Sequence, residues 1–162
     1  MSTENPRNLI WKHIHGIGTC MMVTHDGEHV RARPMTGIVR PEQNVIWFFT
    51  DTQTSKDEEL QRDPRASLTF ADLRDQNFVS VSGRITRVLD KETISDLWDE
   101  GAEAYFPNGP DDPGVVLLKF VPEFGEYWDA PSSTIVMAIK FIEAHIMGER
   151  PDLGTSGAAK FS

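Results

Sequence analysis

The sequence predicts a small antiparallel β-barrel with a few flanking helices, and three observations lead to that fold class. The chain has 162 residues, which is the size of a single domain. Six or more short apolar runs of strand-like composition follow one another, and turn signals such as Asp26-Gly27 separate them. Few segments have helical periodicity, so hairpins and not helical crossovers are expected to connect the strands.

Turn residues divide the expected strands. Asp26-Gly27 and Pro41 mark two tight turns. Gly83 lies inside a long run, where we expect a bend or a bulge. Pro122 lies inside the last long run and favours an edge position or a bend, because proline donates no ladder hydrogen bond. The expected strands are residues 19–24, 30–33, 35–40, 45–50, 66–71, 78–89 and 115–127.

Helical spacing of apolar residues predicts four helices in the single domain of residues 1–162. Asp90 is a candidate N-cap for the longest of them, and Ser55 with Glu58 matches a capping box. The expected helices are residues 8–15, 56–62, 91–105 and 135–146. Segments 1–7 and 149–162 are expected to be irregular tails.

The charge balance excludes one large class of function. There are 16 Lys and Arg residues against 25 Asp and Glu residues, a formal net charge of −9. A nucleic-acid binder needs a basic face, so nucleic acid is not an expected partner. The acidic stretch 51–59 is interpreted as solvated surface. In a domain this small, a deep ligand site would need two subunits to build it.

Cysteine and targeting signals indicate a reduced compartment. Cys20 is the single cysteine, so no intramolecular disulfide is expected, and its apolar neighbours predict a buried, inert thiol. No run approaches the ~18 apolar residues of a membrane span, and no apolar segment typical of a signal peptide follows the first residues. We therefore expect a cytoplasmic protein without a membrane association.

Common catalytic and metal-binding patterns are missing. No Gly-x-Ser-x-Gly elbow, Walker-type loop or Gly-x-Gly-x-x-Gly motif occurs. His25 and His29 flank a turn, but no third ligand is specified, so no metal site is expected.

One constellation predicts an anion site. Arg31 and Arg33 lie on the same face of an extended strand, and Thr54, Ser55 and Lys56 come at the start of a helix. Hydroxyls, a lysine and free backbone N–H groups at a helix N-terminus suit a phosphate, which a neighbouring arginine would clamp. The alternative is a surface arginine pair beside an ordinary capped helix.

Motif order adds a resemblance to this interpretation. The chain contains Arg31-Ala32-Arg33-Pro34-Met35, then Trp47-Phe48-Phe49-Thr50, Ser55-Lys56 and Asp63-Pro64-Arg65-Ala66-Ser67-Leu68-Thr69-Phe70. This order resembles the pyridoxamine 5′-phosphate oxidase-related, FMN-binding split-barrel family. The segments 78–83, 105–113 and 126–129 resemble its general stress protein 26-like branch.

The resemblance implies a mainly β fold, a six-stranded antiparallel split barrel that forms a homodimer with an FMN in each cleft between the subunits. FAD is the alternative flavin. Matching positions imply that Arg33 and Lys56 bind the phosphate, helped by Ser55, Thr54 and Arg31. The other implied cofactor-binding residues are Pro34, Met35 and Thr36 along the isoalloxazine edge, with Phe49, Thr50, Phe78 and Trp128 as further lining residues.

The expected function is that of a flavin-dependent oxidoreductase linked to stress response, with an unidentified redox partner. Because the flavin carries the redox chemistry, we name no catalytic residue. Alternatives are a non-catalytic module that stores, senses or buffers flavin, a deazaflavin or haem ligand, and a barrel with an empty site. Oxidation of pyridoxamine phosphate is not expected, because Arg150 alone does not reproduce the Arg-x-His-Asp-Arg signature of those oxidases.

Overall fold

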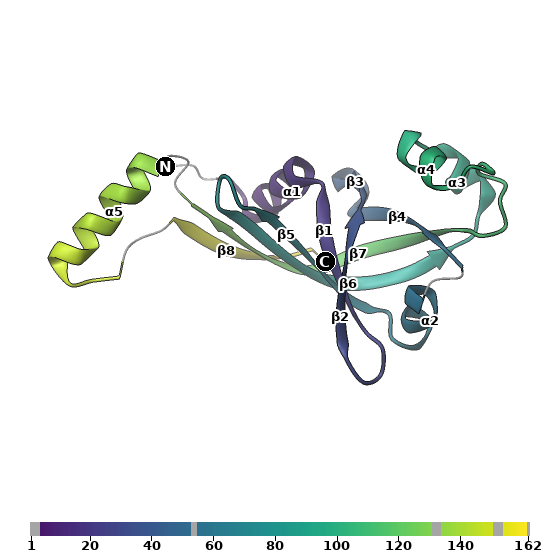
Figure 1. Ribbon diagram of the computed structural model, residues 1–162, viewed down its shortest axis with the longest axis horizontal. Coiled ribbons are helices and arrows are strands. Elements are labelled where there is room, and N and C mark those ends of the chain that lie inside the picture. Colours follow the sequence, from purple (N-terminus) through teal and green to yellow (C-terminus); the bar gives the residue numbers. More distant parts are fainter. Residues whose placement is uncertain (1–3, 53–54, 131–133, 151–153, 162) are drawn as a thin grey trace.

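The computed structural model describes residues 4–52, 55–130, 134–150 and 154–161, with the backbone alone for 55–58 and 134–137. Its central feature is one strongly curled antiparallel sheet (Figure 1). The strand order is β2-β1-β5-β6-β7-β4-β3, and β8 pairs with β7 beside β4. The predicted mainly β split barrel is confirmed, with eight strands in the described residues where six were expected.

The strands are β1 Thr19–His25, β2 Val30–Thr36, β3 Ile38–Arg40, β4 Val45–Asp51, β5 Arg65–Asp72, β6 Asn77–Val88, β7 Val115–Asp129 and β8 Thr155–Lys160. The helices are α1 Pro6–Ile17, the short 3₁₀ helix η1 Pro41–Gln43, α2 Ser55–Arg62, α3 Lys91–Asp96, α4 Glu100–Tyr105 and α5 Thr134–Met147.

Gly37 joins the two outermost strands of the sheet order. It is the single residue between β2 and β3, so the chain itself connects the two edges of the curled sheet. A Cβ at this position would lie 2.6 Å from Cγ2 of Ile46 and 2.8 Å from the ring of Phe48. Glycine therefore allows the chain to turn the corner in direct contact with β4.

The expected irregularity at Gly83 is confirmed. The register of β6 against β7 shifts between Ser82 and Gly83, and a Cβ on Gly83 would overlap the carbonyl oxygen of Val121. Pro122 lies opposite, in the short gap between the part of β7 that pairs with β4 and the part that pairs with β8. β7 is an interior strand, but neither β4 nor β8 pairs with it at Pro122. A proline, which has no backbone N–H, is therefore tolerated at this position.

Two expectations about the later elements are wrong. The single helix expected at 91–105 is two helices, because Asp99 accepts a hydrogen bond from the backbone N–H of Ala102 (2.7 Å) and starts α4. Asp90 caps α3 as predicted. The tail expected to be irregular contains β8, and Phe161 follows it into the core with 4% of its surface exposed.

A main core fills the barrel and a smaller core lies outside it. Ile10, Trp11 and Ile14 of α1 pack into the barrel, where Cys20 is also buried. Burial raises the pKa of the Cys20 thiol to about 12. The prediction of a buried thiol is confirmed, because Cys20 is 3% exposed. The smaller core lies between α3 and α4 and the opposite face of β4 and β7.

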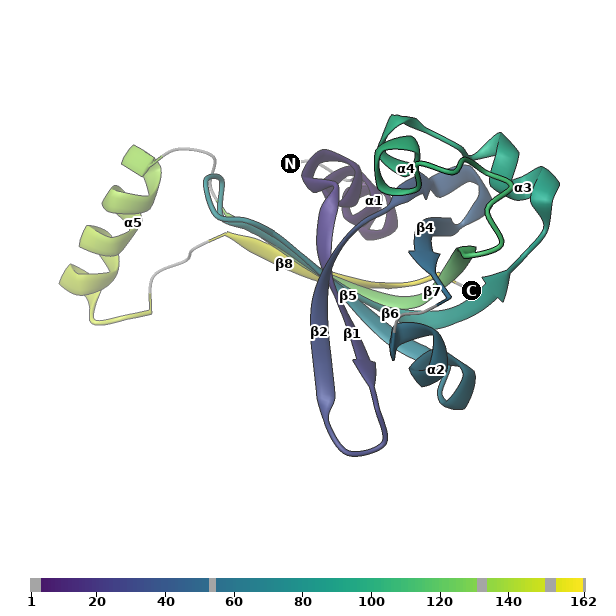
Figure 2. The same cartoon turned by 45° about the vertical axis from the view of Figure 1, so that its right-hand side comes forward.

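Helix α5 stands away from the barrel (Figures 1 and 2). Its described large apolar side chains are exposed, among them Ile139, Phe141, Ile142 and Ile146. Within the described ranges, no helix combines the length and the apolar composition that a membrane crossing requires.

Candidate functional site

A buried carboxylate gathers the two predicted arginines. Oε2 of Glu59 accepts a hydrogen bond from Nη2 of Arg33 (2.8 Å) and another from Oγ1 of Thr24 (2.7 Å). Oε1 accepts one from Nη1 of Arg31 (3.2 Å). We call these four residues the arginine cluster. It joins β1 and β2 to α2, the helix that carries the predicted Ser55 and Lys56.

Strand periodicity explains why both arginines reach Glu59. Thr24 pairs with Arg31 and Met22 pairs with Arg33, so the arginine side chains share a face with the buried side of β1. The prediction that Arg31 and Arg33 occupy one face is confirmed. The hairpin of β1 and β2 extends beyond the body of the barrel (Figure 2). The two arginine side chains differ in exposure, with 50% for Arg31 and 15% for Arg33.

Glu59 is ionised at neutral pH. Its burial acts to raise the pKa of the carboxyl, but hydrogen bonds from Thr24 and Arg33 and the charges of Arg33 and Arg31 outweigh it and lower the pKa below its ordinary value of 4.5. The interpretation of stretch 51–59 as solvated surface is thus wrong at Glu59, which is 5% exposed. A chain-local pattern gives no signal for this burial, because the partners come from two distant strands.

Arg33 keeps an unused donor. Its Nη1 atom is shielded from solvent and has no hydrogen-bond partner among the described residues, although Nη2 is bound to Glu59. A buried donor without a partner is costly, so an oxygen-rich anion that reached this atom would gain a strong contact. The donor chemistry therefore fits a phosphate group.

The other predicted residues on β2 divide between two faces. Met35 is buried in the main core on the arginine side, whereas Pro34 and Thr36 are exposed on the outer face. Oγ1 of Thr36 lies 3.1 Å from Oγ1 of Thr19.

Phe49 and Thr50 also occupy opposite faces of their strand. Thr50 is buried on the barrel side of β4, with 2% of its surface exposed. Phe49 points toward α3 and α4 and meets Trp98 edge to face at 5.5 Å. The two side chains therefore do not line one common surface. Thr54 lies outside the described residues, and Ser55 and Lys56 are described as the backbone of the first turn of α2.

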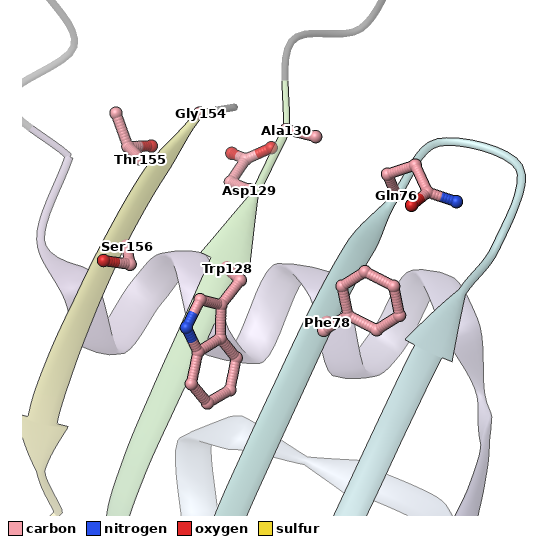
Figure 3. A pocket seen from close by; sticks show the side chains of 8 residues that line it. All are labelled: Gln76, Phe78, Trp128, Asp129, Ala130, Gly154, Thr155 and Ser156. Carbon is pink, nitrogen blue, oxygen red and sulfur yellow. The ribbon is translucent and has the colours of Figure 1, made fainter. Parts of the chain in front are cut away.

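Phe78 and Trp128 line a second candidate site, an open pocket of about 340 Å³ (Figure 3). The two residues pair directly across β6 and β7, and Trp128 is 45% exposed. The opposite wall is formed by the start of β8, with Thr155 and Ser156, and by Gly154 just before it. Sequence reasoning missed that wall, because it treated the C-terminal segment as irregular.

The aromatic pocket and the arginine cluster lie on opposite faces of the sheet. Arg33 shares the inner face with Met22 and Leu68, through the pairing of β2, β1 and β5. Phe78 and Trp128 have the opposite alternation, since the neighbouring Val79 and Tyr127 are the buried residues. One molecule cannot place both groups around one small ligand without the sheet between them.

Comparison with known proteins places the chain in a family. A family model described as "Pyridoxamine 5'-phosphate oxidase like" matches residues 5–152, nearly the whole chain. The chain belongs to the pyridoxamine 5'-phosphate oxidase-like family. The resemblance found in the motifs is thereby confirmed. No curated protein sequence matches the chain.

Solved structures support the membership of this pyridoxamine 5'-phosphate oxidase-like protein. A protein from Jannaschia sp. CCS1, assigned as a general stress protein 26, is 25% identical with a TM-score of 0.75, over 95% of this chain and 97% of its own. The general stress FMN/FAD binding protein from Xanthomonas citri is 27% identical with a TM-score of 0.70, over 82% of this chain and 93% of its own. The general stress protein 26 from Bacillus anthracis, at 21% identity and a TM-score of 0.66, covers 75% of this chain and 92% of its own and shares the fold.

Proposed function

We propose that this pyridoxamine 5'-phosphate oxidase-like protein binds FMN and acts as a flavin-dependent oxidoreductase. The observation that carries the proposal is the unpartnered Nη1 of Arg33 in a cluster fixed by Glu59. The similar protein from Xanthomonas citri, which is named for FMN/FAD binding, supports a flavin as the ligand.

The phosphate end of FMN is assigned to Arg33, with Arg31 as a second cation. Arg31 and Arg33 bring two positive charges against the single carboxylate of Glu59, so the described side chains of the cluster leave an excess of positive charge for a dianion. Lys56 belongs to the first turn of the same helix, three positions before Glu59, and is the third cation of the proposal. A monoester phosphate carries two negative charges on one group and therefore suits this pair of arginines better than the singly charged phosphates of the FAD pyrophosphate.

The ring end is assigned to the outer face of a second copy. Phe78 and Trp128 offer aromatic surface for an isoalloxazine, and their pocket lies across the sheet from Arg33. We therefore propose a homodimer in which one subunit contributes Arg33 and its partner contributes the aromatic pocket. The exposed Met21 on β1 and Phe124 on β7 lie on that same outer face, where a second sheet would cover them.

Bound FMN would supply the electron-transfer chemistry. The residues of this chain anchor and orient it: the cluster holds one end, and the aromatic pair excludes water from the other. The names of the similar proteins favour a role in stress response, and a cytoplasmic location is consistent with the single reduced cysteine.

Titration with flavins tests the proposal. The purified protein is expected to quench FMN fluorescence on binding, to bind FAD more weakly and to sediment as a dimer. Arg33→Ala should weaken FMN binding at least tenfold, about the value of one charge-assisted contact. Arg65→Ala is the matched control, because Arg65 is 75% exposed and pairs with Asp63 outside the cluster. A chain that binds neither flavin contradicts the proposal.

Turnover separates an enzyme from a flavin store. Anaerobic reduction of the bound flavin by NADH or NADPH, followed by reoxidation with a quinone acceptor, is expected for an oxidoreductase. Stable binding without reduction by either nucleotide favours the storage, sensing or buffering module.

A further inference from the structure

We propose that Glu59 is a positioning residue that makes the site prefer a phosphorylated flavin to an unphosphorylated one. This inference rests on the proposed function and adds to it the residue that determines specificity for the phosphate. Glu59 does not have to touch the flavin for this role. It acts through Arg33, whose guanidinium it holds.

The carboxylate of Glu59 is itself held from several sides. Helix α2 carries its backbone, and the hydroxyl of Thr24 on β1 donates to Oε2. The side chain is 6% exposed, so water does not compete for its oxygens. Both carboxylate oxygens accept hydrogen bonds from neighbours, so the Glu59 side chain has one defined orientation. It can therefore hold the guanidinium groups of both arginines in fixed positions.

Holding one nitrogen of a guanidinium orients the others. The guanidinium is planar, so the bond from Nη2 of Arg33 to Oε2 limits where Nη1 can point. Nη1 is shielded from solvent and is left without a partner in the part of the chain that the structure describes. A phosphate oxygen that reaches Nη1 meets an arginine that has already lost its side-chain freedom, which lowers the entropic cost of binding.

The charge of Glu59 does not cancel this effect. A carboxylate repels a phosphate at close range, but both oxygens of Glu59 are occupied by donors, and two of those donors belong to arginines. Riboflavin ends in a hydroxyl and has no anion to place against Nη1. The positioned Arg33 therefore binds FMN more tightly than riboflavin, whereas the aromatic pocket contributes equally to the binding of both because their rings are identical.

The test compares two affinities in each variant. The dissociation constants of FMN and riboflavin are measured by fluorescence quenching for the full chain and for Glu59→Ala, Glu59→Gln and Thr24→Val. Glu123→Ala is the matched control, because Glu123 is exposed and pairs with Arg84 (3.0 Å) on another part of the sheet. Circular dichroism confirms that each variant is folded.

Glu59→Ala is expected to weaken FMN binding about tenfold and to change riboflavin binding by less than twofold. Glu59→Gln keeps an oxygen that can accept from Arg33 and should retain most of the preference for FMN. Thr24→Val should cause a smaller, FMN-selective loss, and it decides the matter if Glu59→Ala does not fold. Glu123→Ala should leave both constants unchanged.

Three results would overturn the inference and leave the proposed function, FMN binding by the wild-type chain, standing. They are equal loss of both ligands in the Glu59 and Thr24 variants, unchanged or tighter FMN binding in Glu59→Ala, and equal weakening by Glu59→Gln and Glu59→Ala. A wild-type chain that binds no FMN would instead overturn the proposed function together with the inference.

Discussion

Phe78 and Trp128 are direct partners across β6 and β7, and together they form the aromatic floor of the open pocket (Figure 3). Their adjacency follows from the register of the two strands beyond the bulge at Gly83, so two residues fifty positions apart in the chain present one apolar surface. Because they lie on the outer face, a ligand or a second molecule can reach them.

Trp128→Ala tests whether this surface binds the flavin ring. We expect FMN and riboflavin to lose affinity by similar factors, about tenfold, because both ligands carry the same ring and lose the same aromatic contact. Fluorescence titration gives both constants. Tyr105→Ala is the aromatic control, since Tyr105 is 70% exposed at the end of α4 and lies outside the pocket. An FMN-selective loss in Trp128→Ala would contradict the assignment of the ring.

Mixing two defective variants tests whether two molecules share one site. If each cleft takes Arg33 from one subunit and Trp128 from its partner, a mixed dimer of Arg33→Ala and Trp128→Ala has one intact cleft and one doubly defective cleft. Random assembly should then restore about a quarter of the tight FMN sites. Each variant alone should show none. Co-refolded mixtures that stay without tight sites would contradict a cleft to which one subunit contributes Arg33 and its partner contributes Trp128.

Part of this site could be predicted from sequence because it depends on local periodicity. Arg31 and Arg33 are two positions apart, so any strand brings them to one face, and Gly83 inside a long apolar run indicates a bulge. These patterns need no knowledge of distant partners.

The remainder depends on contacts between distant segments. Glu59 lies among acidic neighbours in a short helix, and nothing local distinguishes the one carboxylate that Arg33 and Thr24 bury. β8 consists of small and polar residues without strand-like alternation of large apolar ones. It forms because β7 offers a free edge beyond Pro122 and because Phe161 packs edge to face on Trp11 at 5.7 Å.

The stability of the chain in acid should depend on Glu59. Its pKa is lower in the folded protein than its ordinary value of 4.5, so its ionised form stabilises the fold above that value. This contribution is lost as the pH falls through the folded pKa. Urea denaturation should therefore show that Glu59→Gln unfolds at least about 1 kcal/mol more easily than wild type at pH 7.

The difference between Glu59→Gln and wild type should shrink as the pH falls below 4.5 and through the lowered pKa of the folded protein, because protonation then removes the same charge from the wild-type side chain. Glu123→Gln, at an exposed ion pair, should differ little from wild type at any pH. A difference for Glu59→Gln that stays constant over that range would mean that its cost does not come from the charge of Glu59.

Gly83→Ala should be strongly destabilising. An added Cβ would overlap the carbonyl oxygen of Val121 and lie 2.9 Å from Cα of Pro122, and both are backbone atoms that cannot move aside without breaking the ladder of β6 and β7. We expect a loss of about 2–4 kcal/mol in the free energy of unfolding, measured by urea denaturation.

Gly16→Ala provides the contrast for this prediction. Gly16 lies in α1, has an ordinary backbone conformation, and a Cβ there would meet nothing within 4 Å. Alanine in a helix is favoured over glycine, so this variant should be as stable as wild type or more stable by up to about 1 kcal/mol. If Gly83→Ala matched Gly16→Ala, the close crossing of β6 and β7 at the bulge would not exist in solution. The aromatic pocket would then also differ from the one described, because the register beyond that bulge aligns Phe78 with Trp128.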